Sequence, residues 1–153
     1  MVQMNEFMKK AMEEMKRADH LIFVSLKYTR TVDVLKHVIA RLINTLDLAF
    51  SAILEKLKDE GKIDEVPTTP VQKANLLKEK FVDDGQVVEF CDFFLKLRKI
   101  DKASFERARE FRRHVTMTVV LPDDELIEIN IDSITSDFKR TKDFLEHVKQ
   151  LME

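Results

Sequence analysis

The sequence predicts a mostly α-helical protein of one domain, an antiparallel up-and-down helical bundle that carries a short β-hairpin near residues 116–131. Three observations lead to this prediction. Apolar residues recur at every third or fourth position through most of the 153 residues, which is the period of an amphipathic helix. Glycine and proline, which interrupt helices, occur only 2 and 3 times. Near residue 120 the apolar residues alternate instead, and that spacing is typical of a strand.

The length and composition favour one well-solvated domain over residues 1–153. A chain of this length that is 44% hydrophobic can form one core and is too short for two comfortable domains. Charged residues make up 35% of the chain and mix both signs to a net charge of −2, which argues against a disordered chain. The few glycines, the lack of tryptophan and the many lysines and glutamates resemble the composition of heat-adapted proteins.

Three features bear on the cellular compartment. Charged residues occur throughout the N-terminal segment, so it lacks the apolar stretch of a signal peptide. No uncharged apolar run approaches the roughly 20 residues that span a bilayer. The single cysteine, Cys91, lies in an apolar run, so we expect a buried thiol and no internal disulfide. Together these features predict a cytoplasmic protein without a membrane segment.

The first half of the chain predicts three helices. They span residues 5–26, 31–58 and 70–81. Gly61 supplies a C-terminal stop for the second helix, which is the longest. Before the third helix, Thr69 can cap, Pro70 suits the first helical position, and Gln72 stands where a capping box needs it.

The second half predicts three more helices and the hairpin. Asp83-Asp84-Gly85 breaks the chain, and a strongly apolar helix then covers residues 87–97. A fifth helix begins at Asp101 or Ser104 and carries on one face Phe105, Ala108, Phe111 and Val115. The hairpin is predicted from the alternation of Ile127, Ile129 and Ile131. The last helix begins at Ser133 or Ser136 and reaches Leu151.

Residues 96–113 form a strongly basic segment, with eight basic residues against three acidic ones. A basic segment on an otherwise acidic protein is expected where a polyanion binds, because Arg and Lys make most phosphate contacts. Its candidates for nucleic-acid binding are Lys102, Arg107, Arg112 and Arg113. A structural explanation also remains open, because cations in the last turn of the predicted fifth helix would offset its negative end.

Arg109 and His114 lie in the same segment and form the candidate catalytic pair. A guanidinium can grip two phosphate oxygens, and an imidazole that titrates at about pH 6.5 can move protons. The two groups could therefore cleave RNA without a metal, with His114 as general base or acid and Arg109 stabilising charge on the phosphate. In a continuous helix, five residues place two side chains about 140° apart. The pair thus requires that the helix ends or distorts there, or that a dimer axis unites two copies.

Several segments follow one another in an informative order. The first is the long helix from His37-Val38-Ile39-Ala40-Arg41-Leu42 to Ala52-Ile53-Leu54, which is followed by a Thr-Pro helix entry and a short apolar helix. The motif Arg109-x4-His114 comes next. It is followed by Asp123-Asp124-Glu125-Leu126-Ile127 and by a final helix ending Phe144-Leu145-Glu146-His147-Val148. This order resembles the HEPN domain family. It is most similar to the ribonuclease toxins found beside minimal nucleotidyltransferase antitoxins.

The resemblance implies a helical bundle that forms a homodimer, so that two Arg-x4-His motifs line one cleft. It implies a metal-independent endoribonuclease that acts on RNA without a cofactor, with Arg109 matching the family's arginine and His114 its histidine. For the toxin branch it further implies a nucleotidyltransferase antitoxin as a partner. The family usually has a helix where the alternating isoleucines predict the hairpin.

Three positions depart from the family pattern. Glu110 stands where Asn, Asp or His is usual, and its charge would repel a phosphate; Arg113 replaces an aliphatic residue. Thr116 stands where the toxin branch often has the tyrosine that its antitoxin modifies. These departures favour an alternative function, a non-catalytic HEPN-like dimeric module that binds nucleic acid, a nucleotide or a partner protein. A third hypothesis is an unrelated helical interaction module.

The other histidines suggest no metal site. His20, His37 and His147 lie at unrelated points of amphipathic helices, and none has a metal-ligand spacing with Cys91. We therefore expect surface or interface histidines and no bound metal.

Overall fold

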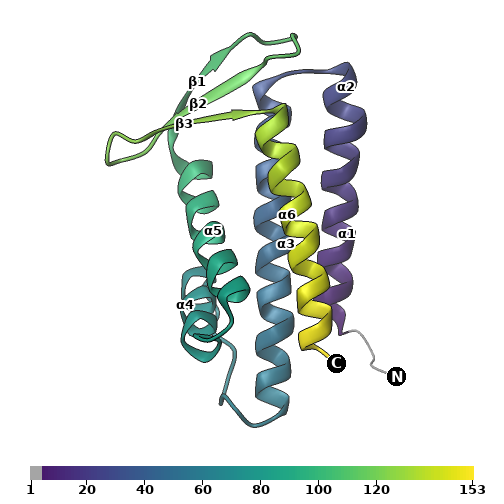
Figure 1. Ribbon diagram of the computed structural model, residues 1–153, viewed down its shortest axis with the longest axis vertical. Helices are drawn as coiled ribbons and strands as arrows, with labels where there is room; N and C mark the ends of the chain where they lie inside the picture. Colours follow the sequence, from purple (N-terminus) through teal and green to yellow (C-terminus); the bar gives the residue numbers. More distant parts are fainter. Residues whose placement is uncertain (1–4) are drawn as a thin grey trace.

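The computed structural model describes residues 5–153 (Figure 1). The helical elements are α1 (Glu6–His20), the π-helical turn η1 (Leu21–Ser25), α2 (Leu26–Tyr28), α3 (Val32–Asp59), α4 (Pro70–Lys80), α5 (Gly85–Lys102) and α6 (Ile131–Leu151). The strands are β1 (Ser104–Ala108), β2 (Thr116–Val120) and β3 (Leu126–Asn130). The mostly helical fold class that the sequence predicts is therefore confirmed.

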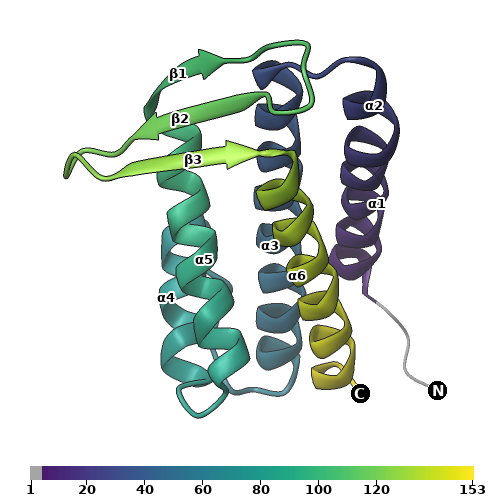
Figure 2. The ribbon, with the colours of Figure 1, turned by 45° about the horizontal axis from the view of Figure 1, so that its top comes forward.

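The helices form an antiparallel up-and-down bundle around α3. This central helix contacts α1, α4, α5 and α6, and the long helices alternate in direction along the chain (Figure 1). The strands lie together at one end of the bundle, where α5 ends and α6 begins (Figure 2). The sheet is thus a cap on the helical bundle.

The core contains a cluster of phenylalanine rings from three helices. Phe50 of α3 packs edge-on against Phe94 of α5, with 5.1 Å between ring centroids. Phe144 of α6 stacks on Phe90 of α5 at 4.5 Å. Each buried phenylalanine contributes about 1.5–3 kcal/mol through the area that it removes from water. The cluster therefore joins α3, α5 and α6 into one core.

The apolar character of α3 follows from its central position. By length and composition alone this helix could cross a membrane, but 61% of its most apolar stretch is buried inside the bundle. Its buried residues include Leu35, Leu42 and Phe50. A helix surrounded by others is expected to be apolar on most sides.

Local capping explains where several helices begin. Thr31 Oγ1 accepts a hydrogen bond from Val34 N at 3.3 Å before α3, and Thr69 Oγ1 accepts one from Gln72 N at 3.3 Å before α4. Asp84 caps α5 in the same way. Gly61 follows α3 with a φ of +75°, a conformation that favours glycine. The predicted ends of α3 and the predicted start of α4 are confirmed, whereas α5 begins two residues before the predicted residue 87.

A π-helical turn interrupts the first helical segment. Leu26 N donates to Leu21 O, five residues earlier, which is the spacing of a π turn. The segment nevertheless continues without a break from α1 through η1 to α2. The predicted helix over residues 5–26 is confirmed, and the π turn within it is a feature that apolar spacing alone did not predict.

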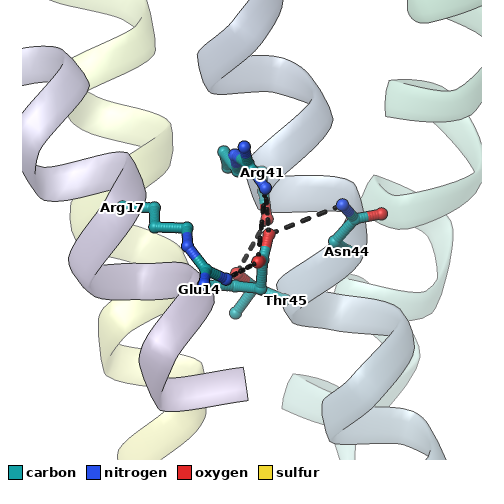
Figure 3. A network of polar contacts seen from close by, with 5 residues as sticks. All are labelled: Glu14, Arg17, Arg41, Asn44 and Thr45. Atoms are coloured by element: carbon teal, nitrogen blue, oxygen red, sulfur yellow. Dashed lines mark hydrogen bonds and ion pairs between the residues drawn. The ribbon is translucent and has the colours of Figure 1, made fainter. Parts of the chain in front are cut away.

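A buried carboxylate fixes α1 against α3. Glu14 is only 7% exposed, and its oxygens accept hydrogen bonds from Arg17, Arg41 and Asn44 (Figure 3). The Arg41 Nη1 to Glu14 Oε2 distance is 3.2 Å. Burial raises the pKa of Glu14, but these hydrogen bonds outweigh it, so the pKa lies below its ordinary value. A charge buried among such partners favours one alignment of the two helices.

The predicted β-hairpin is present as β2 and β3, but it belongs to a three-stranded antiparallel sheet in the order β1-β2-β3. The predicted fifth helix is wrong, because residues 104–108 form β1 and pair with β2 from Ser104↔Val120 to Ala108↔Thr116. Pairing with β2 satisfies the backbone groups of β1 that face it, and this tertiary interaction overrides a weak local helical pattern.

Two helix limits also differ from the prediction. The helix predicted over residues 87–97 is longer, since α5 continues to Lys102. The last helix begins earlier than predicted because Asn130 is its cap: Asn130 Oδ1 accepts from Ser133 N at 2.8 Å, while Ser133 Oγ accepts from Asn130 N at 2.9 Å. Ser133 therefore belongs to the capping box as its third helical residue and not as its cap.

Candidate functional site

The loop over residues 109–115, here called the β1–β2 loop, holds the candidate catalytic pair. Figure 2 shows it reaching over to the turn between α2 and α3. Phe111 N donates to Arg30 O at 2.6 Å, and Val32 N donates to Glu110 Oε2 at 3.2 Å. The loop is thus attached to the helical bundle by two hydrogen bonds.

Glu110 contacts both the start of α3 and Arg107 of β1. Its second oxygen, Oε1, lies 3.2 Å from Arg107 Nη1, and the same guanidinium lies 3.0 Å from Asp33 Oδ1. These hydrogen bonds raise the pKa of Arg107 above its ordinary value. The sequence suggested that Glu110 would repel a phosphate, whereas here its charge is engaged by Arg107 and by the positive end of α3. Arg107, a predicted nucleic-acid contact, is occupied by two carboxylates.

Two bulky residues of the loop adopt a left-handed backbone. The φ angles are +56° at Arg109 and +65° at Phe111, in a region that residues other than glycine seldom occupy. The Phe111 side chain is 75% exposed, so burial of its ring does not compensate for the conformation. Strained residues that the surrounding structure holds in place are concentrated at functional sites.

The hairpin puts Arg109 and His114 in one short loop. Ala108 pairs with Thr116 across the two strands, so Arg109 leaves one strand and His114 stands shortly before the other. The 140° separation expected for a helix no longer applies, because the segment is not helical. Both side chains are exposed, and neither has a hydrogen-bond or ion-pair partner within residues 5–153.

The remaining predicted nucleic-acid contacts divide between two places. Arg112 belongs to the loop and is exposed, with no side-chain partner in the part of the chain that the structure describes. Arg113 Nη2 lies 3.0 Å from Asp132 Oδ1 at the start of α6. Lys102 ends α5 and is separated from the loop by the whole of β1. The helix-end explanation for Arg112 and Arg113 is wrong, since no helix ends at these residues.

One histidine makes a contact that the sequence did not indicate. His147 Nε2 of α6 lies 2.8 Å from Asp84 Oδ2, and Asp84 Oδ1 also caps α5. Burial raises the pKa of Asp84, but the hydrogen bonds from His147 and Val87 outweigh it and leave the pKa below its ordinary value. The sequence predicted a turn over residues 83–85, but it did not indicate that Asp84 contacts His147. The contact joins α5 to α6 and has a structural role.

Two other groups bear on reactivity. Cys91 is fully buried, as predicted, and burial raises the pKa of its thiol to about 12. Such a thiol is a poor nucleophile. Within residues 5–153, no three His, Cys, Asp or Glu side chains gather closely enough to hold a metal ion.

Comparison of the chain with known protein families, with curated proteins and with solved structures finds no match. The chemistry of the β1–β2 loop is therefore the basis on which a function can be proposed.

Proposed function

We propose that this protein binds single-stranded RNA at the β1–β2 loop. One observation carries the proposal: Arg109, Phe111 and Arg112 are all exposed on a loop whose backbone is held by hydrogen bonds. The neighbouring cations Arg107 and Arg113 are engaged by carboxylates, whereas Arg109 and Arg112 have no side-chain partner among residues 5–153 and can meet an external anion.

The residue types of the loop match the chemistry of a single strand. A guanidinium offers a planar set of donors to phosphate oxygens, and an exposed phenylalanine offers a face on which a base can stack. A second exposed aromatic residue, Tyr28, lies two residues before Arg30, whose carbonyl anchors the loop. Cations interleaved with exposed aromatic rings favour unpaired bases over a duplex, whose bases are already stacked.

The test is RNA binding measured by fluorescence anisotropy with a labelled single strand. Replacing Arg109 and Arg112 together by glutamine should weaken binding at low salt. It should also reduce the slope of log affinity against log salt by about 1.4, because each lost phosphate contact on a single strand removes about 0.7. The double variant Lys58→Gln and Lys62→Gln is the control, since it removes the same charge from the last turn of α3 and the segment that follows it, far from the loop.

Equal losses in the two double variants would mean that only net charge matters, and the loop would no longer be the proposed site. An affinity that does not change with salt would point to a different kind of ligand.

A second candidate function, metal-independent RNA cleavage, is favoured by the presence of Arg109 and His114 in one hairpin loop. His114 would take the proton of a ribose 2′-OH, whose oxygen attacks the adjacent phosphorus. The bond from phosphorus to the 5′-oxygen breaks, and the leaving 5′-oxygen takes up a proton from water. The products are a 2′,3′-cyclic phosphate and a 5′-hydroxyl. Arg109 would stabilise the charge that develops on the phosphate oxygens.

Cleavage is tested with a structured RNA in EDTA. His114→Ala should abolish cleavage and leave RNA binding nearly unchanged, whereas Arg109→Ala should reduce both, because its guanidinium can contact phosphate before and during reaction. If the His114→Ala protein cleaves normally, the catalytic proposal is withdrawn and the binding proposal stands.

The resemblance to the HEPN family implies two copies of the loop in one cleft, and the catalytic proposal therefore predicts a homodimer. Sedimentation at micromolar concentration should show twice the 18.0 kDa mass of one chain. A single 18.0 kDa species would contradict this proposal.

A further inference from the structure

A cavity of about 760 Å³ lies between α5 and the turn that joins β2 to β3, and we call it the α5 cavity. Its helical wall is one face of α5, formed by Asp92, Leu95, Lys96, Lys99 and Lys102, together with Ala103 just after the helix. The turn contributes Leu121, Pro122, Asp123 and Glu125. The volume falls within the range of small-molecule sites, which is about 300–1,000 Å³.

The turn that closes the cavity has a defined shape. Asp124 N donates to Leu121 O at 2.9 Å, and Leu121 N donates to Glu125 O at 2.9 Å. Lys96 Nζ lies 3.7 Å from Glu125 Oε1 and joins the turn to the helix. The turn is therefore held in shape by its own hydrogen bonds, and one ion pair connects it to α5.

The carboxylates around the cavity are already engaged, and two of its cations are not. Glu125 pairs with Lys96, and Asp92 Oδ1 lies 2.6 Å from Lys78 Nζ. Asp123 Oδ1 accepts a hydrogen bond from Glu125 N at 3.1 Å. Lys99 and Lys102 have no ion-pair or hydrogen-bond partner among residues 5–153. The charges left for a ligand are thus two ammonium groups on adjacent turns of one helix.

Apolar side chains provide the rest of the binding surface. Leu95 of α5 and Ala103, which caps the end of that helix, face the cavity together with Leu121 and Pro122 of the turn. Cations near the end of α5 offset the negative end of the helix dipole, but that effect does not explain why apolar residues line a cavity beside them. Ligand sites characteristically combine an apolar wall with a few charged groups that orient the ligand.

We propose that the α5 cavity binds a small amphipathic anion. Its phosphate or carboxylate group would contact Lys99 and Lys102, and its apolar part would lie against Leu95, Leu121 and Pro122. A fatty carboxylate and a nucleoside monophosphate both have this chemistry. The cavity and the β1–β2 loop lie at opposite ends of β2, whose five residues span about 17 Å, so this site is separate from the proposed RNA interface (Figure 2).

The test is isothermal titration of the full chain with decanoate and with adenosine monophosphate. At least one of these probes should bind with a 1:1 stoichiometry. The Lys99→Gln, Lys102→Gln double variant should weaken that binding at least tenfold, whereas the Lys99→Arg, Lys102→Arg variant should retain it. Lys58→Gln with Lys62→Gln is the charge-matched control and should bind like the original protein.

Neutral and purely polar probes complete the test. Decanol has the apolar chain without an anionic group, and inorganic phosphate has the anionic group without an apolar part. Both should therefore bind at least tenfold more weakly than the amphipathic anion. The proposal is overturned if neither anion binds, if decanol or inorganic phosphate binds as well, or if the glutamine variant binds normally. Tighter binding of decanoate would identify the ligand as a fatty carboxylate, and tighter binding of adenosine monophosphate would identify it as a nucleoside monophosphate. Lys99→Gln alone should leave RNA affinity unchanged, which separates failure at this site from failure at the loop.

Discussion

Phe111 shows how a single residue of the β1–β2 loop departs from what folding alone would favour. Its left-handed backbone costs about 1–2 kcal/mol for a residue that carries a side chain, and its ring is 75% exposed. Glycine could take the same conformation with the same hydrogen bond from its backbone N–H to Arg30 O. An exposed ring at a strained position is explained if the ring contacts a ligand.

The substitution Phe111→Gly tests that explanation. The melting temperature should stay the same or rise, because the relief of strain offsets the larger backbone freedom of glycine when unfolded. RNA affinity should fall at least about fivefold, since stacking of a base on an aromatic ring contributes about 1–3 kcal/mol. Phe111→Tyr should retain the affinity. A lower melting temperature with unchanged RNA binding would assign the ring to folding.

At the scale of elements, the long helices could be predicted from the sequence because each carries its own apolar stripe. Residues 104–115 could not, because their structure depends on β2. Phe105, Ala108, Phe111 and Val115 do have helical spacing, but Phe111 is exposed, so no continuous face is buried. A strand of five residues is favoured only once its partner strand is present.

The sequence indicated part of the candidate site but not its arrangement. Arg109 and His114 were identified from their residue types and from the family resemblance, whereas Phe111 was expected on the apolar face of a helix. The cross-strand pairing of Ala108 with Thr116 places all three in one loop. The sequence could not show that Arg107 is engaged by Asp33, because that contact joins distant parts of the chain. A cation that is paired with carboxylates has a structural role, whereas a cation without such a partner can contact a ligand.

Glu110 connects the loop to the first turn of α3, and replacing it tests whether this contact stabilises the fold. Glu110→Ala leaves the Val32 N–H without its acceptor, and it should lower the free energy of unfolding by about 1 kcal/mol. Glu110→Gln keeps an acceptor and should cost less. Urea denaturation measures both variants. Identical stability of the alanine variant and the original protein would show that this contact contributes nothing.

For the whole molecule, one buried and one half-buried carboxylate connect the helices and make the fold sensitive to acid. Glu14 joins α1 to α3, and Asp84 joins α5 to α6. Both have a pKa lowered in the folded state, so each stabilises the fold above the pKa of the unfolded chain. That contribution is lost as the pH falls through the folded-state pKa. Asp137 acts in the opposite direction, since burial raises its pKa.

The corresponding prediction concerns Glu14→Gln. The free energy of unfolding of the original protein should decline as the pH falls below about 5, because the unfolded chain takes up protons first at about pH 4.3. The glutamine variant should be less stable at pH 7, and its decline in acid should be shallower. Urea denaturation at a series of pH values measures both. Parallel curves for the two proteins would exclude Glu14 as a source of the acid sensitivity.

The attachment of the β1–β2 loop has a consequence for slow motions. The hydrogen bonds to Arg30 and Val32 join it to the helices, and β1 beside it is mostly exposed, whereas Met117 and Val119 of β2 are buried in the core. The loop and β1 can therefore open as a local unit while β2 and the bundle stay folded. Backbone amides of β1 should exchange with deuterium faster than those of Leu42 and Leu46, and Glu110→Ala should accelerate the exchange of β1 alone. RNA held by the loop should slow exchange in the loop and in β1, because a ligand stabilises the closed state that binds it.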